Sequence, residues 1–159
     1  MWQAIYYIFF TLTLFYGLYY SLTGLYGFLK PKKFKIVPFE AEKKFAIIIA
    51  ARNEEAVVGN LVKSVLDSNY PRNLFEVYVA VNNTTDNTAK VAKEAGAIVI
   101  DVKEKVKSKG EVLRYVFKKL RNRKDIDAYI IFDADNIIHP DFLARMNDTL
   151  CCGYRVAQG

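Results

Sequence analysis

The stretch Phe45-Ala-Ile-Ile-Ile-Ala50, followed at once by the polar turn Ala51-Arg52-Asn53-Glu54, decides the fold. A short unbroken run of apolar residues is typical of a strand that is buried on both faces of a sheet. After the turn, residues 54–69 carry apolar side chains at the i, i+3 and i+4 spacing of a helix that packs one face. We expect Asn53 to be the N-cap of that helix. The stretch therefore predicts a sheet that helices cover.

The same alternation of apolar strands and amphipathic helices continues along the rest of the chain. Further strands are expected at 75–81, 97–102, 128–132 and, at its beginning, 155–158; further helices are expected at 86–95, 109–122 and 140–150. Gly96 stands where a glycine would end the helix at 86–95. The pattern predicts an α/β domain with a mostly parallel sheet, right-handed crossovers and flanking helices.

An uncharged segment precedes this domain. Residues 2–29 hold none of the 40 charged residues of the chain and 11 of its 23 aromatic residues. As a helix the segment would be about 42 Å long, more than the ~30 Å hydrocarbon core of a bilayer requires. We predict one transmembrane helix over 1–29. A cleaved signal peptide is the alternative, which the missing basic n-region and missing small-residue cleavage site disfavour.

Residues 30–44 form a basic linker of net charge +4. Four of its lysines follow the apolar segment directly, whereas the short N-terminal side has no basic side chain: they are Lys30, Lys32, Lys33 and Lys35. The positive-inside rule then predicts a single-pass protein of the cell membrane, with its domain on the cytoplasmic side. The remaining residues, 45–159, are enough for one core.

Composition and motifs exclude several classes of function. The chain is 52% hydrophobic and 25% charged, which argues against intrinsic disorder. No glycine pattern of a dinucleotide-binding or P-loop protein is present. His139 is the only histidine and the two cysteines are adjacent, so the sequence lacks the usual ligand set of a zinc site. Despite a pI of about 9.2, no aromatic interleaving or known motif accompanies the basic stretch 103–124, and we expect no nucleic-acid partner.

Polar turns follow the predicted strands, and the carboxyl ends of parallel strands meet at one edge of a sheet. Asp133 and Asp135 come directly after the strand at 128–132. Such oxygen ligands suit Mg²⁺ or Mn²⁺ that is also held by substrate phosphates, and the metal would neutralise a diphosphate leaving group. Two solvated turn residues are an equally good reading of this D-x-D pair alone. Lys109, beside Gly110, is placed at a helix start where it could meet a phosphate or a base.

Four polar turns or helix starts follow one another along the chain. They are Ile-Ile-Ala-Ala-Arg-Asn-Glu-Glu (48–55), Asn-Asn-Thr-Thr-Asp-Asn-Thr (82–88), Lys-Gly (109–110) and Phe-Asp-Ala-Asp-Asn (132–136). Over 45–159 this set resembles the family 2 glycosyltransferases of GT-A fold, most of all their membrane-bound branch akin to cellulose and hyaluronan synthases. The resemblance implies an enzyme of polysaccharide biosynthesis. It would transfer a sugar from a nucleotide sugar, which we predict to be a UDP-sugar, to a hydroxyl of a carbohydrate or lipid-linked acceptor, with metal assistance and inversion.

The resemblance also implies roles for six residues. Asn53 and Glu54 would form the first donor-binding turn, and Lys109 would lie near the base and the phosphates. Asn82 stands where the family usually has an aspartate that accepts a hydrogen bond from the base, and this departure leaves the base preference open. Asp133 would contact both donor and metal, and Asp135 would be the more direct metal ligand.

The catalytic base of the family lies further downstream, so we expect it beyond Gly159. On this interpretation 45–159 is the nucleotide-sugar-binding half of an incomplete GT-A domain, and the chain is a fragment that is inactive alone. Two alternatives remain open. One is a non-catalytic, membrane-tethered module that binds nucleotides or another protein. The other is a nucleotidyltransferase, whose glycine-rich activation loop is not seen.

Overall fold

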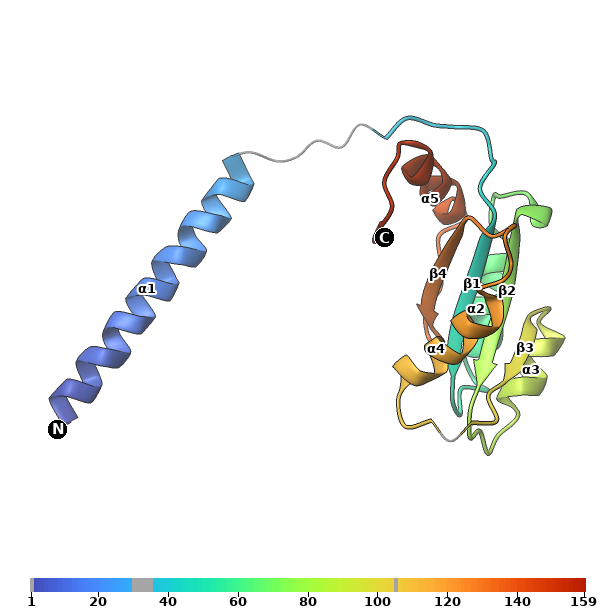
Figure 1. Ribbon diagram of the computed structural model, residues 1–159, viewed down its shortest axis with the longest axis horizontal. Coiled ribbons are helices and arrows are strands. Elements are labelled where there is room, and N and C mark those ends of the chain that lie inside the picture. Colours follow the sequence, from blue (N-terminus) through green and yellow to red (C-terminus); the bar gives the residue numbers. More distant parts are fainter. Residues whose placement is uncertain (1, 30–35, 105) are drawn as a thin grey trace. The chain divides into compact units, whose positions relative to one another are not determined.

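The structure is a computed structural model that describes residues 2–29, 36–104 and 106–159. The chain divides into two compact units, Met1–Lys35 and Ile36–Gly159. In the first unit, helix α1 (Trp2–Leu29) is exposed along its whole length (Figure 1). By length and composition it could cross a membrane, a test that a signal sequence near the N-terminus also passes. Lys30, Lys32, Lys33 and Lys35, which predict the orientation, lie outside the described residues.

The second unit is built on a four-stranded sheet (Figure 1). Its strands are β1 (Phe45–Ala51), β2 (Phe75–Val81), β3 (Ile98–Asp101) and β4 (Ala128–Asp133), in the spatial order β3-β2-β1-β4. All three neighbouring pairs are parallel, which confirms the predicted parallel sheet. The chain places β2 and β3 on one side of β1 and β4 on the other, so the order reverses beside β1.

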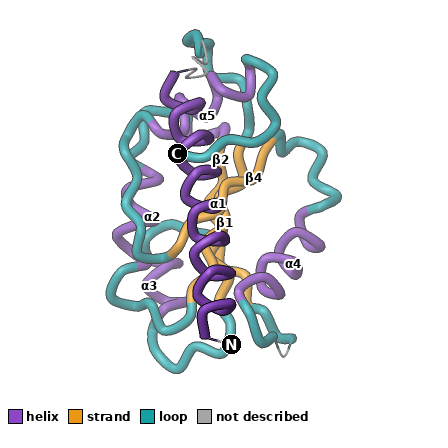
Figure 2. Tube along the Cα trace, turned by 90° about the vertical axis from the view of Figure 1, so that its left-hand side faces the viewer, coloured by secondary structure: helices purple, strands orange, loops and turns teal. Residues whose placement is uncertain are grey.

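Helices cover both faces of this sheet. They are α2 (Val58–Leu66), α3 (Thr88–Glu94), α4 (Lys109–Leu120) and α5 (Phe142–Cys151), with a short 3₁₀ helix at Arg72–Leu74. In Figure 2, α2 and α3 lie on one side of the strands and α4 on the other. Ile47 and Ile49 belong to the core that α2, α3 and α5 cover, whereas Ile48 belongs to the core under α4. Since successive side chains of β1 point to opposite faces, both of which are covered, the strand must be apolar throughout.

One predicted helix start and one predicted strand are wrong. The helix predicted from residue 54 begins at Val58, and Asn53 is not its N-cap. Asn53 has a φ of 57°, in the left-handed region, whereas an N-cap residue is normally extended. Residues 155–158 form no strand, because no described residue pairs with them in a ladder. Gly96 ends α3 as expected, with a φ of 102° that favours glycine.

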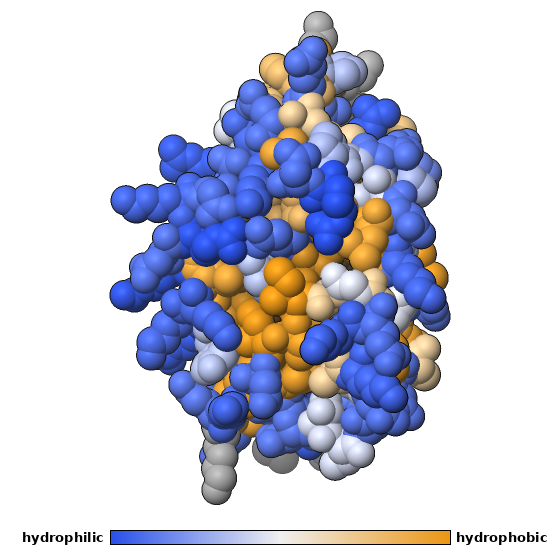
Figure 3. Space-filling view, turned by 90° about the vertical axis from the view of Figure 1, so that its right-hand side faces the viewer, coloured by the Kyte–Doolittle hydropathy of each residue, from blue (hydrophilic) through white to orange (hydrophobic). Residues whose placement is uncertain are grey.

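Both outer strands of the sheet present apolar side chains. Figure 3 shows the side of the molecule on which β3 is outermost, and apolar surface there is framed by polar residues. Ile98 of β3 is 48% exposed, and Ile131 of β4, at the other edge, is 45% exposed. The helices thus cover the middle of the sheet and leave its outer strands partly open.

Candidate functional site

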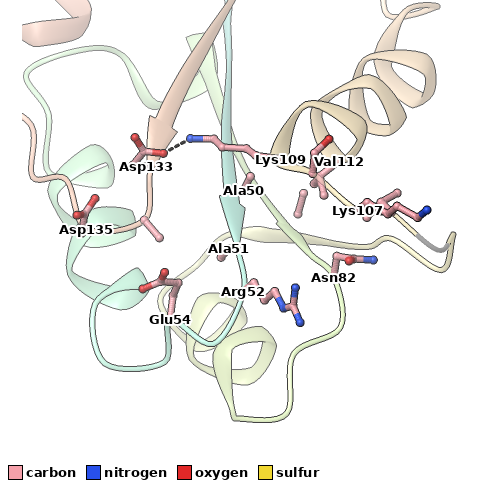
Figure 4. Close-up of a pocket in the computed structure, with 14 residues that line it drawn as sticks. Ala50, Ala51, Arg52, Glu54, Asn82, Lys107, Lys109, Val112, Asp133 and Asp135 are labelled. Carbon is pink, nitrogen blue, oxygen red and sulfur yellow. Dashed lines mark hydrogen bonds and ion pairs between the residues drawn. The ribbon is translucent and has the colours of Figure 1, made fainter.

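A cavity of about 390 Å³ opens at the carboxyl edge of the sheet, where β1, β2 and β4 end (Figure 4). Small side chains of the strands form its floor. Its polar lining consists of Arg52, Glu54, Asn82, Lys107, Ser108, Lys109, Asp133 and Asp135. Ligands of open α/β sheets bind at the carboxyl edge where the strand order reverses, and this cavity lies there.

The turn after β1 contributes Glu54 to the cavity and uses Asn53 to hold the turn in place. The Asn53 Oδ1 accepts a hydrogen bond from the Thr85 backbone N–H at 2.9 Å, which ties this turn to the one after β2. The Glu54 N–H donates to Thr88 Oγ1 at 2.8 Å. Asn53, predicted to bind the donor, is not among the residues that line the cavity. Its side chain positions the turn.

Asn82, at the end of β2, is buried, with 5% of its surface exposed. Its Nδ2 donates to the carbonyl oxygens of Val102 and Glu104, at 2.9 and 3.3 Å. Both amide hydrogens are therefore used by the backbone that follows β3. The Oδ1 accepts no hydrogen bond from the described part of the chain, so Asn82 meets the cavity as a hydrogen-bond acceptor.

Asp86 serves the start of α3. Its Oδ1 accepts the Thr88 N–H at 3.0 Å, and its Oδ2 accepts the Glu55 N–H at 3.1 Å. The hydrogen bond from the Thr88 hydroxyl is the main cause that holds the pKa of Asp86 below its usual range. Asp86 does not line the cavity, which agrees with a capping role.

The two aspartates after β4 differ in their partners. The ammonium group of Lys109, the first residue of α4, pairs with the carboxylate of Asp133 (Figure 4). The Asp133 N–H also donates to Asn136 Oδ1 at 3.1 Å, which shapes the turn. Asp135 has neither a hydrogen bond nor an ion pair with any described residue, and its exposed carboxylate lines the cavity. The site thus holds one acid that a lysine neutralises and one that is available.

The donor chemistry of this edge fits a hard divalent cation. Asp133, Asp135 and Glu54 are oxygen donors, and the cavity lining contains no histidine or cysteine. Within 2–29, 36–104 and 106–159 no group of three or more potential side-chain ligands is gathered. A cation here would need further oxygen ligands from a phosphate or from water, as Mg²⁺ and Mn²⁺ commonly do.

The structure also brings residues to the cavity that were not predicted as donor-binding. Lys107 and Ser108 belong to the segment before α4, and Ser108 accepts the Glu111 N–H at 3.3 Å as the N-cap. Arg52, in the turn after β1, is also part of the lining. The basic run before the helix was the available signal for Lys107, but the sequence does not say which of its lysines faces the sheet.

A parallel α/β sheet with paired acids and a lysine at its carboxyl edge places this chain in the class of GT-A proteins. The profile of the family described as "Glycosyltransferase like family 2" matches residues 42–159. The chain belongs to this family, as its turns predict.

Two curated relatives share part of the chain. The protein RfbJ of Shigella flexneri is 36% identical over 91 residues, which are 57% of this chain and 64% of RfbJ. The 4,4'-diaponeurosporenoate glycosyltransferase of Staphylococcus aureus strain USA300 is 43% identical over 60 residues, 38% of this chain and 15% of that enzyme. The chain therefore spans less than two thirds of either relative.

Solved structures share the fold. The mannosyltransferase PcManGT from Pyrobaculum calidifontis, solved with GDP-Man and Mn²⁺, has a TM-score of 0.65 at 20% identity, over 84% of this chain and 39% of that one. S. aureus TarS 1–349, solved with UDP-GlcNAc, has a TM-score of 0.60 at 20% identity, over 68% and 31%. These similarities confirm the predicted GT-A fold.

Proposed function

We propose that this chain is the nucleotide-sugar-binding part of a membrane-anchored glycosyltransferase. The whole enzyme would transfer a sugar from a UDP-sugar to an acceptor hydroxyl, with inversion and with Mn²⁺ or Mg²⁺. The observation that carries the proposal is the cavity itself, which combines Lys109, Asp133 and Asp135 at the carboxyl edge of a family 2 sheet.

Lys109 would bind the diphosphate of the donor, while Asp133 would orient its ammonium group and contact the diphosphate through the cation. Their ion pair is exposed, with 44% of the Lys109 side chain accessible, so the ammonium group can turn to a phosphate oxygen. Asp135 would hold the divalent cation, because its carboxylate has no competing partner among the described residues. The cation supplies neutralisation of the charge that develops on the departing diphosphate.

Asn82 supports a base that has a ring N–H group. Its amide nitrogen is fixed by two backbone carbonyls, so an acceptor is the hydrogen-bonding capacity that remains. Uracil and guanine carry a ring N–H on the edge used for base pairing, whereas adenine and cytosine have a ring acceptor there and could meet Asn82 only through an exocyclic amino group. A base that leaves the Asn82 oxygen unpaired would bind less tightly. We propose uridine, as in the donor of TarS.

The acceptor site and the general base are proposed to lie in the part of the whole enzyme that this chain does not span. Two aspartates outside the cavity already serve the fold. Asp148 Oδ1 accepts the Phe39 N–H at 2.8 Å, and Asp141 Oδ1 accepts from Asn69 Nδ2 at 2.7 Å. Neither is proposed as the base.

Calorimetry on the full chain in detergent tests the proposal. We expect UDP to bind in the presence of Mn²⁺ and to lose at least about tenfold in affinity when a chelator removes the metal, a change of ~1.4 kcal/mol. ADP and CDP serve as controls for the base and should bind more weakly than UDP. Far-UV circular dichroism establishes that the sample is folded. A folded chain that does not bind UDP with metal would overturn the proposed donor site, and equal binding of all nucleotides would overturn the role of Asn82.

A further inference from the structure

The chain that arrives from α1 is held on the second unit by buried side chains of α5. Residues 36–44 form no helix or strand. The Phe39 N–H donates to Asp148 Oδ1 at 2.8 Å, and the Glu42 N–H donates to Asn147 Oδ1 at 3.2 Å. Asn147 and Asp148 are 1% and 5% exposed. We call residues 36–44 the strap, and its attachment leads directly to the start of β1.

The strap shortens the free chain that joins α1 to the second unit. Seven peptide steps separate Leu29 from Ile36. At no more than about 3.6 Å each they span roughly 25 Å. A longer free linker would need residues 36–44 to detach, and buried hydrogen bonds oppose that.

Four cations are exposed at the amino edge of the sheet, where β1 begins: Lys118, Lys119, Arg121 and Lys124, which we call the basic edge. They lie in the last turn of α4 and directly after it, where the helix has returned from the cavity to the opposite edge. The strap and this segment are joined, because the Asp127 N–H donates to the Lys44 carbonyl at 2.9 Å. No described acid forms an ion pair with a member of the basic edge.

Two of the acids nearby are occupied by other cations. Asp125 lies 2.7 Å from both Arg123 and Lys44, and Glu76 lies 2.9 Å from Arg123 and 3.3 Å from Lys44. These two acids and two bases balance each other. The four cations of the basic edge outnumber Asp127, a nearby exposed acid that forms no ion pair with a described cation, and so leave an excess of positive charge.

We propose that the basic edge binds anionic lipid headgroups of the membrane in which α1 is anchored. The inference rests on the proposed membrane anchor. Exposed lysine and arginine near an anionic bilayer are attracted to it over a distance comparable to the Debye length. The proposed anchor in α1 makes a bilayer the anionic surface that is always present, whereas a nucleic acid would have to approach the membrane. The aromatic ring of α4 nearest to it, Phe117, packs against Tyr129 with ring centroids 5.1 Å apart and is occupied by the core.

Lysine footprinting of the full chain tests the proposal. The chain is reconstituted in vesicles of phosphatidylcholine alone, or with about one third phosphatidylglycerol, and treated with an amine reagent that does not cross membranes. We expect Lys118, Lys119 and Lys124 to react at least about threefold more slowly in the anionic vesicles, and high salt to abolish the difference. Lys63 of α2 and Lys93 of α3, which are exposed on the opposite face of the sheet, are internal controls and should not change.

A pair of matched charge reversals sharpens the result. In the double variant Lys118→Glu, Lys119→Glu, we expect Lys124 to react as fast in anionic vesicles as in neutral ones. In the control double variant Lys63→Glu, Lys93→Glu, Lys124 should still react more slowly in the anionic vesicles. Equal reactivity of the wild type in both vesicles overturns the proposal. Protection of the same lysines by soluble RNA and not by anionic vesicles also overturns it and indicates a nucleic-acid surface. Flotation with neutral vesicles measures the anchor separately, since only α1 can hold the chain there.

Discussion

The two edges of one sheet use charged side chains in opposite ways. At the amino edge, Glu76 and Asp125 share Arg123 and Lys44, with every N···O distance between 2.7 and 3.3 Å. The Tyr78 hydroxyl donates to Glu76 as well. At the carboxyl edge, by contrast, Asp135 has no partner among the described residues.

The backbone conformation also differs between the two edges. Among described residues other than glycine, only Asn53 and Asn83 have a positive φ, of 57° and 49°, and both stand in turns of the carboxyl edge. Backbone in such conformations is held by its surroundings and often accompanies binding sites. The comparison shows that charged side chains at the amino edge pair with one another and stabilise the fold, while the carboxyl edge keeps polar groups available for a ligand.

The largest expected effect comes from removing one acid at each edge. Asp135→Ala should lower the Mn²⁺-dependent affinity for UDP by about a hundredfold, or ~2.7 kcal/mol, because it removes the proposed metal ligand. Asp125→Ala removes an acid that is also exposed, from the amino edge, and should leave that affinity within about twofold. Calorimetry with and without metal measures both. If Asp125→Ala weakens binding as much as Asp135→Ala, the division of roles between the edges is wrong.

An intermediate effect is expected from acid. The hydrogen bonds from Arg123, with smaller contributions from Tyr78 and Lys44, lower the pKa of Glu76 to about 2 from its usual 4.5. Because the folded-state pKa is depressed, the stabilisation is complete above about pH 5 and is lost as the pH falls toward 2. After allowance for screening at this partly exposed side chain, we expect a loss of about 1–2 kcal/mol in the free energy of unfolding.

Urea titrations between pH 7 and pH 3 measure this slope. Far-UV circular dichroism is the suitable signal, because the single tryptophan, Trp2, lies in α1 and does not report on the sheet. Glu76→Gln should be less stable at pH 7 and should flatten the pH dependence, whereas Asp135→Asn should keep the slope of the wild type. An unchanged slope in Glu76→Gln would contradict the assigned role of the amino-edge network.

The sequence predicts the sheet well because burial on both faces leaves a plain signal. Residues 45–50 are apolar without interruption, and six of the seven residues of β1 are buried. The start of α2 was mispredicted, because Asn53 is a good capping residue by type. Its side chain instead bonds Thr85, a partner 32 residues away that local spacing cannot reveal. The strand expected at 155–158 lacks a partner, and pairing is a property of the fold rather than of the segment.

The candidate site was predicted to a similar extent. Glu54, Asn82, Lys109, Asp133 and Asp135 line one cavity, as parallel strands require of residues that follow them. Lys107 and Ser108 were missed because their approach depends on how the segment before α4 folds back over the sheet. The amino-edge network of Glu76, Asp125, Arg123 and Lys44 is not visible in the sequence either, since its groups come from segments up to 81 residues apart.

The smallest expected effect compares the two residues of positive φ. Asn83→Gly relieves a left-handed conformation at an exposed site whose side chain makes no hydrogen bond with a described residue, so it should raise the free energy of unfolding by no more than about 0.5 kcal/mol. Asn53→Gly gains the same relief but removes the acceptor of the Thr85 N–H, 2.9 Å away, and should be about 1 kcal/mol less stable than Asn83→Gly. Urea titrations of both variants at pH 7 measure the difference. If the two variants are equally stable, the bond between the turns does not hold the carboxyl edge in shape. The preorganisation of the cavity would then have to come from the strands alone.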